Sequence, residues 1–208
     1  MLSLSAAPAS EPVTSDEAKL HLKVENSTDD ALIAELIKAA RQMAETFTGR
    51  GFITQTWILE LDGLPRGRRE PQWEGVREGS INHLLPARTF IDLGIAPVSA
   101  ITAFKYFDLS DTEQDFSSDN YFLDSTHTPP RVALNQGQSW PTGIRPVKSL
   151  KITMTVGYGD ASSVPSDIKV AIKQILSHLY ENRGDGEAQY LMPLAAKAIL
   201  DPYILRRL

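Results

Sequence analysis

The spacing of apolar residues changes twice along this chain, and these changes narrow the folds that it can adopt. From Asp29 to Thr48, and again from Pro165 to Tyr180, apolar side chains recur at helical spacing. From Ile53 to Leu61 they recur at every second residue, which is typical of a strand with one buried face. The sequence therefore predicts an α+β fold: mainly a helical bundle, with two N-terminal and one or two C-terminal helices. A small antiparallel β region or hairpin projection is expected in the middle.

Local signals set the boundaries of the helical parts. Thr14 and Glu17 have the spacing of a capping box, which predicts a helix opening at residue 15, and Gly49 supplies a C-terminal stop. We expect helices within 15–48, a β region over 53–156, a helix over 166–183 and a short last helix over 191–200. These elements define an ordered domain of residues 13–190, followed by a C-terminal segment of residues 191–208. The first twelve residues are small, polar and proline-containing, so they are predicted to form a flexible arm.

Short runs with strand character divide the middle of the chain. They are separated by turn-forming stretches such as Asp108 to Asp119. Besides the strand from Ile53 to Leu61, the predicted strands are Asn82–Leu85, Ile101–Phe107, Asn120–Leu123, Arg131–Leu134 and Leu150–Val156.

Composition excludes several classes of protein. The chain has no cysteine, so disulfides and thiolate chemistry are absent. No stretch approaches the roughly 18 consecutive apolar residues of a membrane-spanning helix, and no signal peptide is evident, so we expect no membrane association. A net charge of -5 argues against attraction of the whole surface to DNA. The region from Arg66 to Arg88 gathers five arginines, but interspersed glutamates favour a long exposed loop.

Motifs that carry chemistry are weak or missing. Thr155 to Gly159 spells a potassium-filter sequence, but without flanking membrane helices it indicates a strand end and a glycine turn. The four histidines are dispersed, and no nucleophile elbow, phosphate loop or dinucleotide fingerprint occurs. We therefore predict no catalytic residues, no metal site and no cofactor. Trp140 is interpreted as a packing residue, with a ligand-stacking platform as the alternative.

A co-linear series of short motifs resembles the phage head-tail connector (adaptor) family, which also occurs in prophages and gene transfer agents. The resemblance runs from Pro12 to about Leu205, and departs from the family in a long charged loop from Arg66 to Gly79 and a variable stretch from Gly143 to Lys148. The matching residues are Pro12-Val13-Thr14, Asp16-Glu17-Ala18-Lys19, His21-Leu22, Asp29-Asp30-Ala31-Leu32-Ile33, Phe47-Thr48-Gly49-Arg50, Ile53-Thr54-Gln55-Thr56-Trp57, Leu61-Asp62-Gly63, Ser139-Trp140-Pro141, Val156-Gly157-Tyr158-Gly159, Val164-Pro165, Ile168-Lys169, Ala171-Ile172 and Tyr180-Glu181-Asn182-Arg183.

The resemblance implies a structural subunit of a particle neck, assembled in the cytoplasm of the bacterial host. It implies a twelve-fold homo-oligomeric ring between the portal protein and a tail-side neck protein. Double-stranded DNA would pass through the axial channel without sequence recognition. The predicted portal-docking residues are Leu191, Leu194, Ile199, Leu200, Tyr203, Leu205, Arg206 and Arg207. The predicted tail-side or subunit contact loop holds Arg66, Arg68, Arg69, Trp73 and Arg77.

Two other functions remain open at this point. A different neck or tail-completion protein would share the class but not the position in the particle. A DNA-binding packaging accessory would require a basic face in the Arg66 to Arg88 region.

Overall fold

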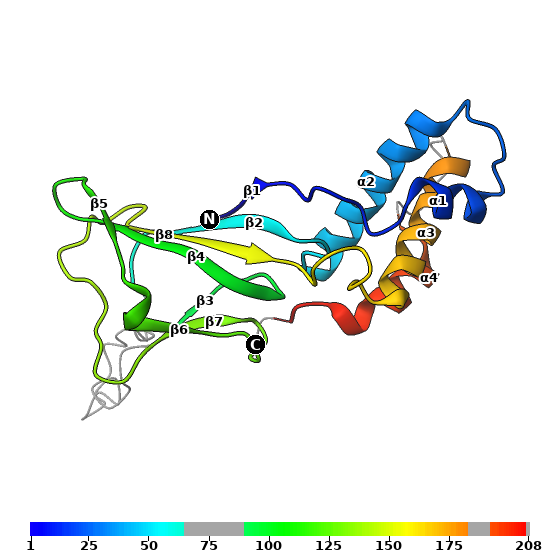
Figure 1. Cartoon of the computed structure of the whole chain (residues 1–208). Coiled ribbons are helices and arrows are strands. Elements are labelled where there is room, and N and C mark those ends of the chain that lie inside the picture. Colours follow the sequence, from blue (N-terminus) through cyan, green and yellow to red (C-terminus); the bar gives the residue numbers. More distant parts are fainter. Residues whose placement is uncertain (65–89, 183–191, 207–208) are drawn as a thin grey trace, which may run out of the picture.

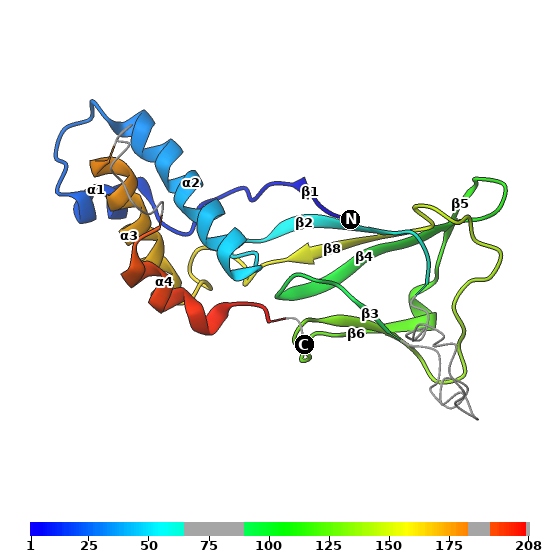
Figure 2. The same ribbon diagram turned by 180° about the vertical axis from the view of Figure 1, so that it is seen from behind.

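The structure is a computed structural model that describes residues 1–64, 90–182 and 192–206. It has a helical unit at one end and a two-layered β unit at the other, joined end to end (Figures 1 and 2). The helices are α1 (Ser15–Leu22), α2 (Asp30–Thr48), α3 (Ser166–Glu181) and α4 (Leu194–Leu200), with short 3-10 turns at Ser118–Asn120 and Asp201–Tyr203. The strands are β1 (Leu2–Ala6), β2 (Gln55–Leu61), β3 (Phe90–Asp92), β4 (Val98–Phe107), β5 (Glu113–Asp115), β6 (Tyr121–Asp124), β7 (Arg131–Leu134) and β8 (Leu150–Val156). The predicted α+β class is confirmed, and the β part is larger than the hairpin projection that we expected.

The helical unit forms because α2 and α3 each bury one apolar stripe against the other. Ile33 and Ile37 of α2, together with Ile172 and Ile175 of α3, are almost fully buried in the same core. The predicted capping box is present, since Thr14 accepts from the backbone N–H of Glu17 while the Glu17 carboxylate accepts from that of Thr14. Gly49 ends α2 in the left-handed conformation, as predicted.

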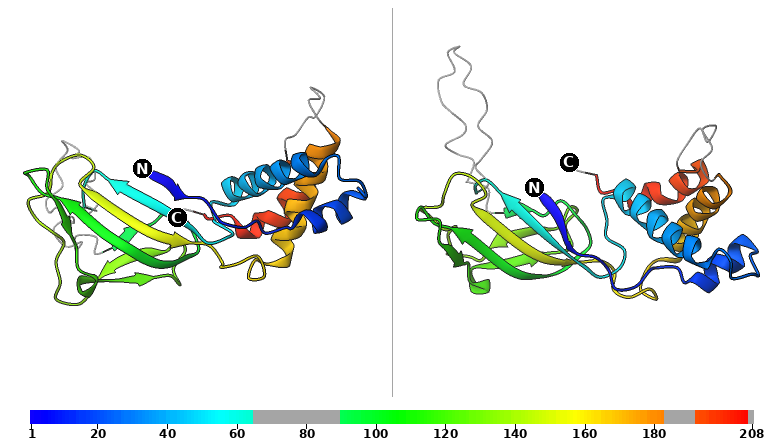
Figure 3. Two further views of the ribbon diagram at one scale, coloured as in Figure 1. Left: turned by 45° about the horizontal axis from the view of Figure 1, so that its top comes forward. Right: turned by 90° about the horizontal axis from the view of Figure 1, so that it is seen from above.

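The β unit consists of two antiparallel sheets that face each other. The larger sheet has the strand order β1-β2-β8-β4-β5, and the smaller has the order β3-β7-β6. Leu150, Ile152, Met154 and Val156 of β8 point to the buried side, and the residues between them point away. Figure 1 shows the two layers edge-on, and Figure 3 shows from two further directions how the helices gather beyond one end of the sandwich.

The two long edges of the sandwich differ. On the side of β5 and β6, the space between the sheets is closed by a cluster of aromatic rings. Phe104 lies 5.0 Å from Phe116 and 6.0 Å from Trp140 between ring centroids, and Phe116 stacks on Tyr121 at 5.8 Å. Trp140 is therefore a packing residue, as interpreted from the sequence. The opposite side, between β1, β2 and β3, contains a cavity.

The N-terminal arm corrects a prediction. Residues 2–6, which were expected to be flexible, form β1 and pair antiparallel with β2, Leu2 opposite Leu59 and Leu4 opposite Trp57. The alternating leucine and serine residues give this segment a strand pattern with one apolar face, and that pattern outweighs its small and polar composition.

Other strand predictions have mixed outcomes. The strands expected near Ile101, Asn120, Arg131 and Leu150 are present as β4, β6, β7 and β8, whereas Asn82–Leu85 lies outside the described residues. β3 and β5 were not predicted. β8 ends at Val156, and Gly157 and Gly159 then adopt positive φ angles of 126° and 130°, which confirms that the filter-like sequence is a strand end followed by a glycine turn.

Candidate interaction surfaces

A buried ion cluster lies where the helical unit meets the β unit. The side chain of Arg41 is 5% exposed; its Nε donates to Glu11 at 2.7 Å and its Nη1 donates to Glu45 at 2.6 Å. Glu45 also accepts hydrogen bonds from the backbone N–H of Phe52 at 2.8 Å and from Gln55 Nε2 at 2.9 Å. The cluster therefore ties the N-terminal segment, α2 and the start of β2 to one another.

The electrostatics of this cluster depend on all its members. Burial raises the pKa of Glu45, while the Phe52 N–H and the charge of Arg41 oppose that shift. Burial also disfavours charge on Arg41, but its hydrogen bond to Glu11 and the charge of Glu45 outweigh that effect, and its pKa is raised. Removing Arg41 would leave the buried carboxylate of Glu45 without the cation of this cluster, which costs far more than breaking a surface ion pair. The junction is thus a firmly held connection between the two units.

The C-terminal segment is attached to the same junction. Leu205 donates its backbone N–H to the Thr48 carbonyl at 2.7 Å, and Arg50 Nε donates to the Tyr203 carbonyl at 2.6 Å. A Cβ on Gly49 would lie 3.3 Å from Leu205 Cβ, so the absence of a side chain at Gly49 lets the tail lie close to the end of α2. These contacts hold residues 203–205 against the end of α2 and the residues that follow it.

The predicted docking residues fall into different environments. Leu200 is fully buried in the helical core and Ile199 packs against that core, so Leu200 serves the fold and is not available for docking. Leu194 is 68% exposed, and Arg206 is exposed and pairs with Asp201 at 3.6 Å. Tyr203 and Leu205 are partly buried at the junction. The remaining two, Leu191 and Arg207, lie outside the described residues.

The structure does not describe the predicted contact loop. Arg66, Arg68, Arg69, Trp73 and Arg77 all fall within residues 65–89, outside the described residues. Their role as a tail-side or subunit contact stays a prediction.

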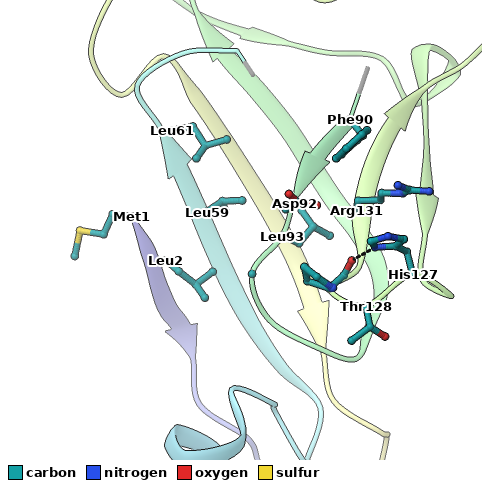
Figure 4. A pocket seen from close by; sticks show the side chains of 12 residues that line it. Met1, Leu2, Leu59, Leu61, Phe90, Asp92, Leu93, His127, Thr128 and Arg131 are labelled. Atoms are coloured by element: carbon teal, nitrogen blue, oxygen red, sulfur yellow. Dashed lines mark hydrogen bonds between the residues drawn. The ribbon is translucent and has the colours of Figure 1, made fainter. Parts of the chain in front are cut away.

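A cavity of about 620 Å³ opens at the β1 edge of the sandwich (Figure 4). Leu2, Leu59, Leu61, Phe90 and Leu93 form the apolar part of its wall, and Asp92, His127, Thr128 and Arg131 form a polar part. Its polar neighbours are engaged with the protein: His127 Nδ1 lies 2.8 Å from the Pro129 carbonyl oxygen, and Arg131 pairs with Asp124 at 2.9 Å while its guanidinium lies over the Phe90 ring. Sequence reasoning missed this cavity because β1 and β3, two of its walls, were not predicted.

Within the described ranges, no group of three or more histidine or acidic side chains is arranged to hold a metal ion. No helix among these residues has the length and apolar character needed to cross a membrane.

Comparison with known proteins bears directly on the resemblance seen in the sequence. Residues 13–71 match the model of the family described as phage gp6-like head-tail connector protein. This segment includes α1, α2 and β2. No curated protein matches the chain at a significant level.

Solved structures match over the whole length. A chain from the neck of an empty GTA particle, computed with C6 symmetry, superimposes with a TM-score of 0.76. A chain from the neck of a native GTA particle, computed with C12 symmetry, gives 0.75, and one from the virion of a native gene transfer agent (GTA) particle gives 0.73. Each is 23% identical, and each alignment covers 100% of this chain and 97% of the other.

These findings define the class of protein. The fold, from the N-terminal strand to the C-terminal segment, is that of chains found in particle necks. Residues 13–71 are similar to the phage gp6-like head-tail connector family, and over this segment the match confirms the resemblance identified from the sequence.

Proposed function

We propose that this chain is a non-enzymatic structural connector subunit that forms a ring between the portal and the tail of a phage or phage-like particle. The observation that carries the proposal is the co-occurrence of a head-tail connector domain at residues 13–71 and a neck-protein fold over the entire chain. The connector match favours this function over a tail-completion protein or a DNA-binding packaging accessory. In this role the protein resides in the particle neck, after assembly in the host cytoplasm.

The proposed ring is homo-oligomeric and twelve-fold, and one of the matching neck structures was computed with C12 symmetry. Identical subunits close a ring when one face of each copy binds a different face of the next. A firm junction suits this task, because a hinge between the units would let the angle between neighbours vary. The Arg41 cluster supplies such a junction.

Portal docking is proposed for the exposed side of the C-terminal segment. Leu194 and Arg206 are accessible there, and Tyr203 and Leu205 anchor the segment beside α2. Double-stranded DNA crosses the ring without sequence recognition, and a net charge of -5 is consistent with weak adhesion to the phosphate backbone.

Solution mass tests the proposal. The purified chain is measured by light scattering alone and with its cognate portal, and the larger species is imaged by negative stain. We expect rings of about a dozen subunits in the presence of the portal. A chain that stays monomeric and does not bind the portal would overturn the proposed function.

Mutation of Leu194 separates docking from folding. Leu194→Asp is expected to weaken the portal complex while leaving the thermal midpoint of the free chain unchanged, because the side chain is exposed. Leu200→Asp, in contrast, is expected to unfold the helical unit, because it places a charge in the core. Unchanged portal binding by Leu194→Asp would remove the proposed docking site.

A further inference from the structure

Two loops at the end of the sandwich farthest from the helices display large apolar side chains to solvent. One loop joins β4 to β5 and carries Leu109, which is 73% exposed. The other precedes β8 and carries Val147, which is 61% exposed. Figure 1 shows this end of the molecule beyond the label of β5. We call these two loops, residues 108–112 and 144–148, the distal tip.

Arg145 fastens the two loops of the distal tip together. Its Nε and Nη2 donate to the Lys148 carbonyl at 3.2 and 2.8 Å, and its Nη1 reaches Asp111 at 3.4 Å. The guanidinium also lies 3.8 Å from the centre of the Phe107 ring. The backbone adds a bridge between Asp108 and Ile144.

Each loop is also held internally. Asp108 accepts from the backbone N–H groups of Ser110 at 2.8 Å and Thr112 at 3.0 Å, and these bonds lower the pKa of its carboxyl. In the second loop, the backbone N–H of Lys148 donates to Asp62 at 3.0 Å. Asp111 and Lys148 have positive φ angles of 58° and 48°, conformations that persist where the surrounding structure enforces them.

This construction suits binding of another protein. An ordered loop loses little conformational freedom when it docks, so burial of its apolar side chains contributes more fully to affinity. Exposed apolar side chains on a rigid scaffold are typical anchors for insertion into a pocket of a partner. Leu109 and Val147 make no contribution to either hydrophobic core that would explain their presence.

The charges around the anchors indicate what kind of partner fits. Within the tip, the side chain of Asp111 is 78% exposed and that of Lys148 is 59% exposed, whereas the side chain of Arg145 is 25% exposed and is committed to the loops. The tip therefore carries charges of both signs and no cluster of cations, which disfavours DNA and favours a protein surface. An apolar pocket with charged side chains of both signs at its rim would complement it.

We infer that the distal tip is the surface by which the connector binds the tail-side neck protein, through an apolar pocket whose rim carries charges of both signs. This inference rests on the proposed function. The segment proposed to dock on the portal lies at the helical end of the molecule, and the distal tip lies at the opposite end, where a tail-side partner would bind (Figure 1). The inference assigns the tail-side contact to residues 108–112 and 144–148, and not to the loop around Arg66 and Arg77 that the sequence suggested.

Cross-linking in assembled particles tests the inference, and the cysteine-free chain makes labelling unambiguous. Leu109→Cys and Val147→Cys connectors carrying a maleimide-benzophenone are built into particles and irradiated. Phe122→Cys is the matched control, since Phe122 is an exposed apolar residue on β6. Cross-links from both tip positions, and not from Phe122, to a neck protein other than the portal or this chain are expected.

Other outcomes are equally decisive. Cross-links to a second copy of this chain, to the portal or to DNA, or no cross-link at all from a connector present in the neck, would overturn the inference and leave the proposed function standing. Absence of the chain from the neck would overturn the proposed function itself, and the inference with it.

A joining assay adds a quantitative test. Heads that carry connectors with Leu109→Asp and Val147→Asp are mixed with purified tails, and tailed particles are counted by electron microscopy. The apolar surface lost predicts a decrease in joining affinity of about tenfold for each side chain. Phe122→Asp should join tails normally, and normal joining by the double variant would contradict the inference.

Discussion

Arg41 and Glu45, one turn apart on α2, hold their side chains 2.6 Å from each other at the junction between the helical and β units. The pair is nearly enclosed, and Glu45 also accepts from Phe52 and Gln55 on the far side of the junction. A helix surface pair at this spacing is worth only a few tenths of a kcal/mol. This pair has a larger role because it connects two structural units and is largely shielded from solvent, with side chains 5% and 12% exposed.

Replacing Glu45 tests that role. Glu45→Gln leaves Arg41 with Glu11 as its remaining carboxylate and removes one charge-assisted hydrogen bond, so we expect a loss of about 2 kcal/mol in the free energy of unfolding. Urea denaturation of the variant and the parent protein measures this difference in the free energy of unfolding. Glu35→Gln, an exposed acid on the same helix, is the matched control and should change stability by less than about 0.5 kcal/mol. Equal effects of the two substitutions would show that the junction does not depend on this pair.

Hydrogen exchange tests the strand at the N-terminus. Because β1 pairs with β2, backbone amides within residues 2–6 should exchange more slowly than in an unstructured peptide. Leu2→Ser should also destabilise the protein by about 1.5 kcal/mol, since Leu2 packs against the sandwich core. Ser5→Ala, on an exposed residue, is the control. Random-coil exchange over residues 2–6 would restore the interpretation of this segment as a flexible arm.

Gly157 offers a test of the turn after β8. Its φ of 126° suits glycine, and an added Cβ would clash with the backbone of Ile53 and lie 2.7 Å from the Thr54 nitrogen. Gly157→Ala should therefore cost at least about 2 kcal/mol, measured by thermal or chemical denaturation. Gly63→Ala meets nothing within 4 Å and should have little effect. Similar midpoints for the two variants would contradict the described turn.

Substitutions of Trp140 test whether this residue packs in the sandwich or forms a platform for ligand stacking. Its Nε1 is buried, and no hydrogen-bond acceptor for it is found among the described residues. Trp140→Phe keeps an aromatic ring near Phe104 and Phe116 and removes this donor, so stability should stay within about 1 kcal/mol of the parent. Trp140→Ala should lose about 3 kcal/mol. If neither variant altered stability, Trp140 would not belong to the core of the sandwich.

The elements that sequence reasoning found have strong local signals. The capping box at Thr14 and Glu17, the stripe along α2 and the alternation in β2 all arise from neighbouring residues, and the structure contains each. β3 and β5 have three residues each, too few for a periodic pattern. β3 also pairs with β7, a distant part of the chain, whereas β5 forms a short hairpin with β4.

The candidate surfaces were harder to predict for the same reason. The apolar residues of the C-terminal segment indicated docking, but α4 buries Leu200 against the helical unit. Whether an apolar residue faces a core or a partner depends on tertiary packing. The distal tip illustrates the converse: Leu109 and Val147 are 38 positions apart in the sequence, and folding places their loops together.

Cryo-electron microscopy of the chain bound to its cognate portal is the most direct test of the central claim. We predict a closed ring of twelve subunits on the portal, with the helical units and C-terminal segments toward the portal and the distal tips pointing away. A particle in which the chain is monomeric, forms no closed ring or lies outside the portal axis would contradict the account.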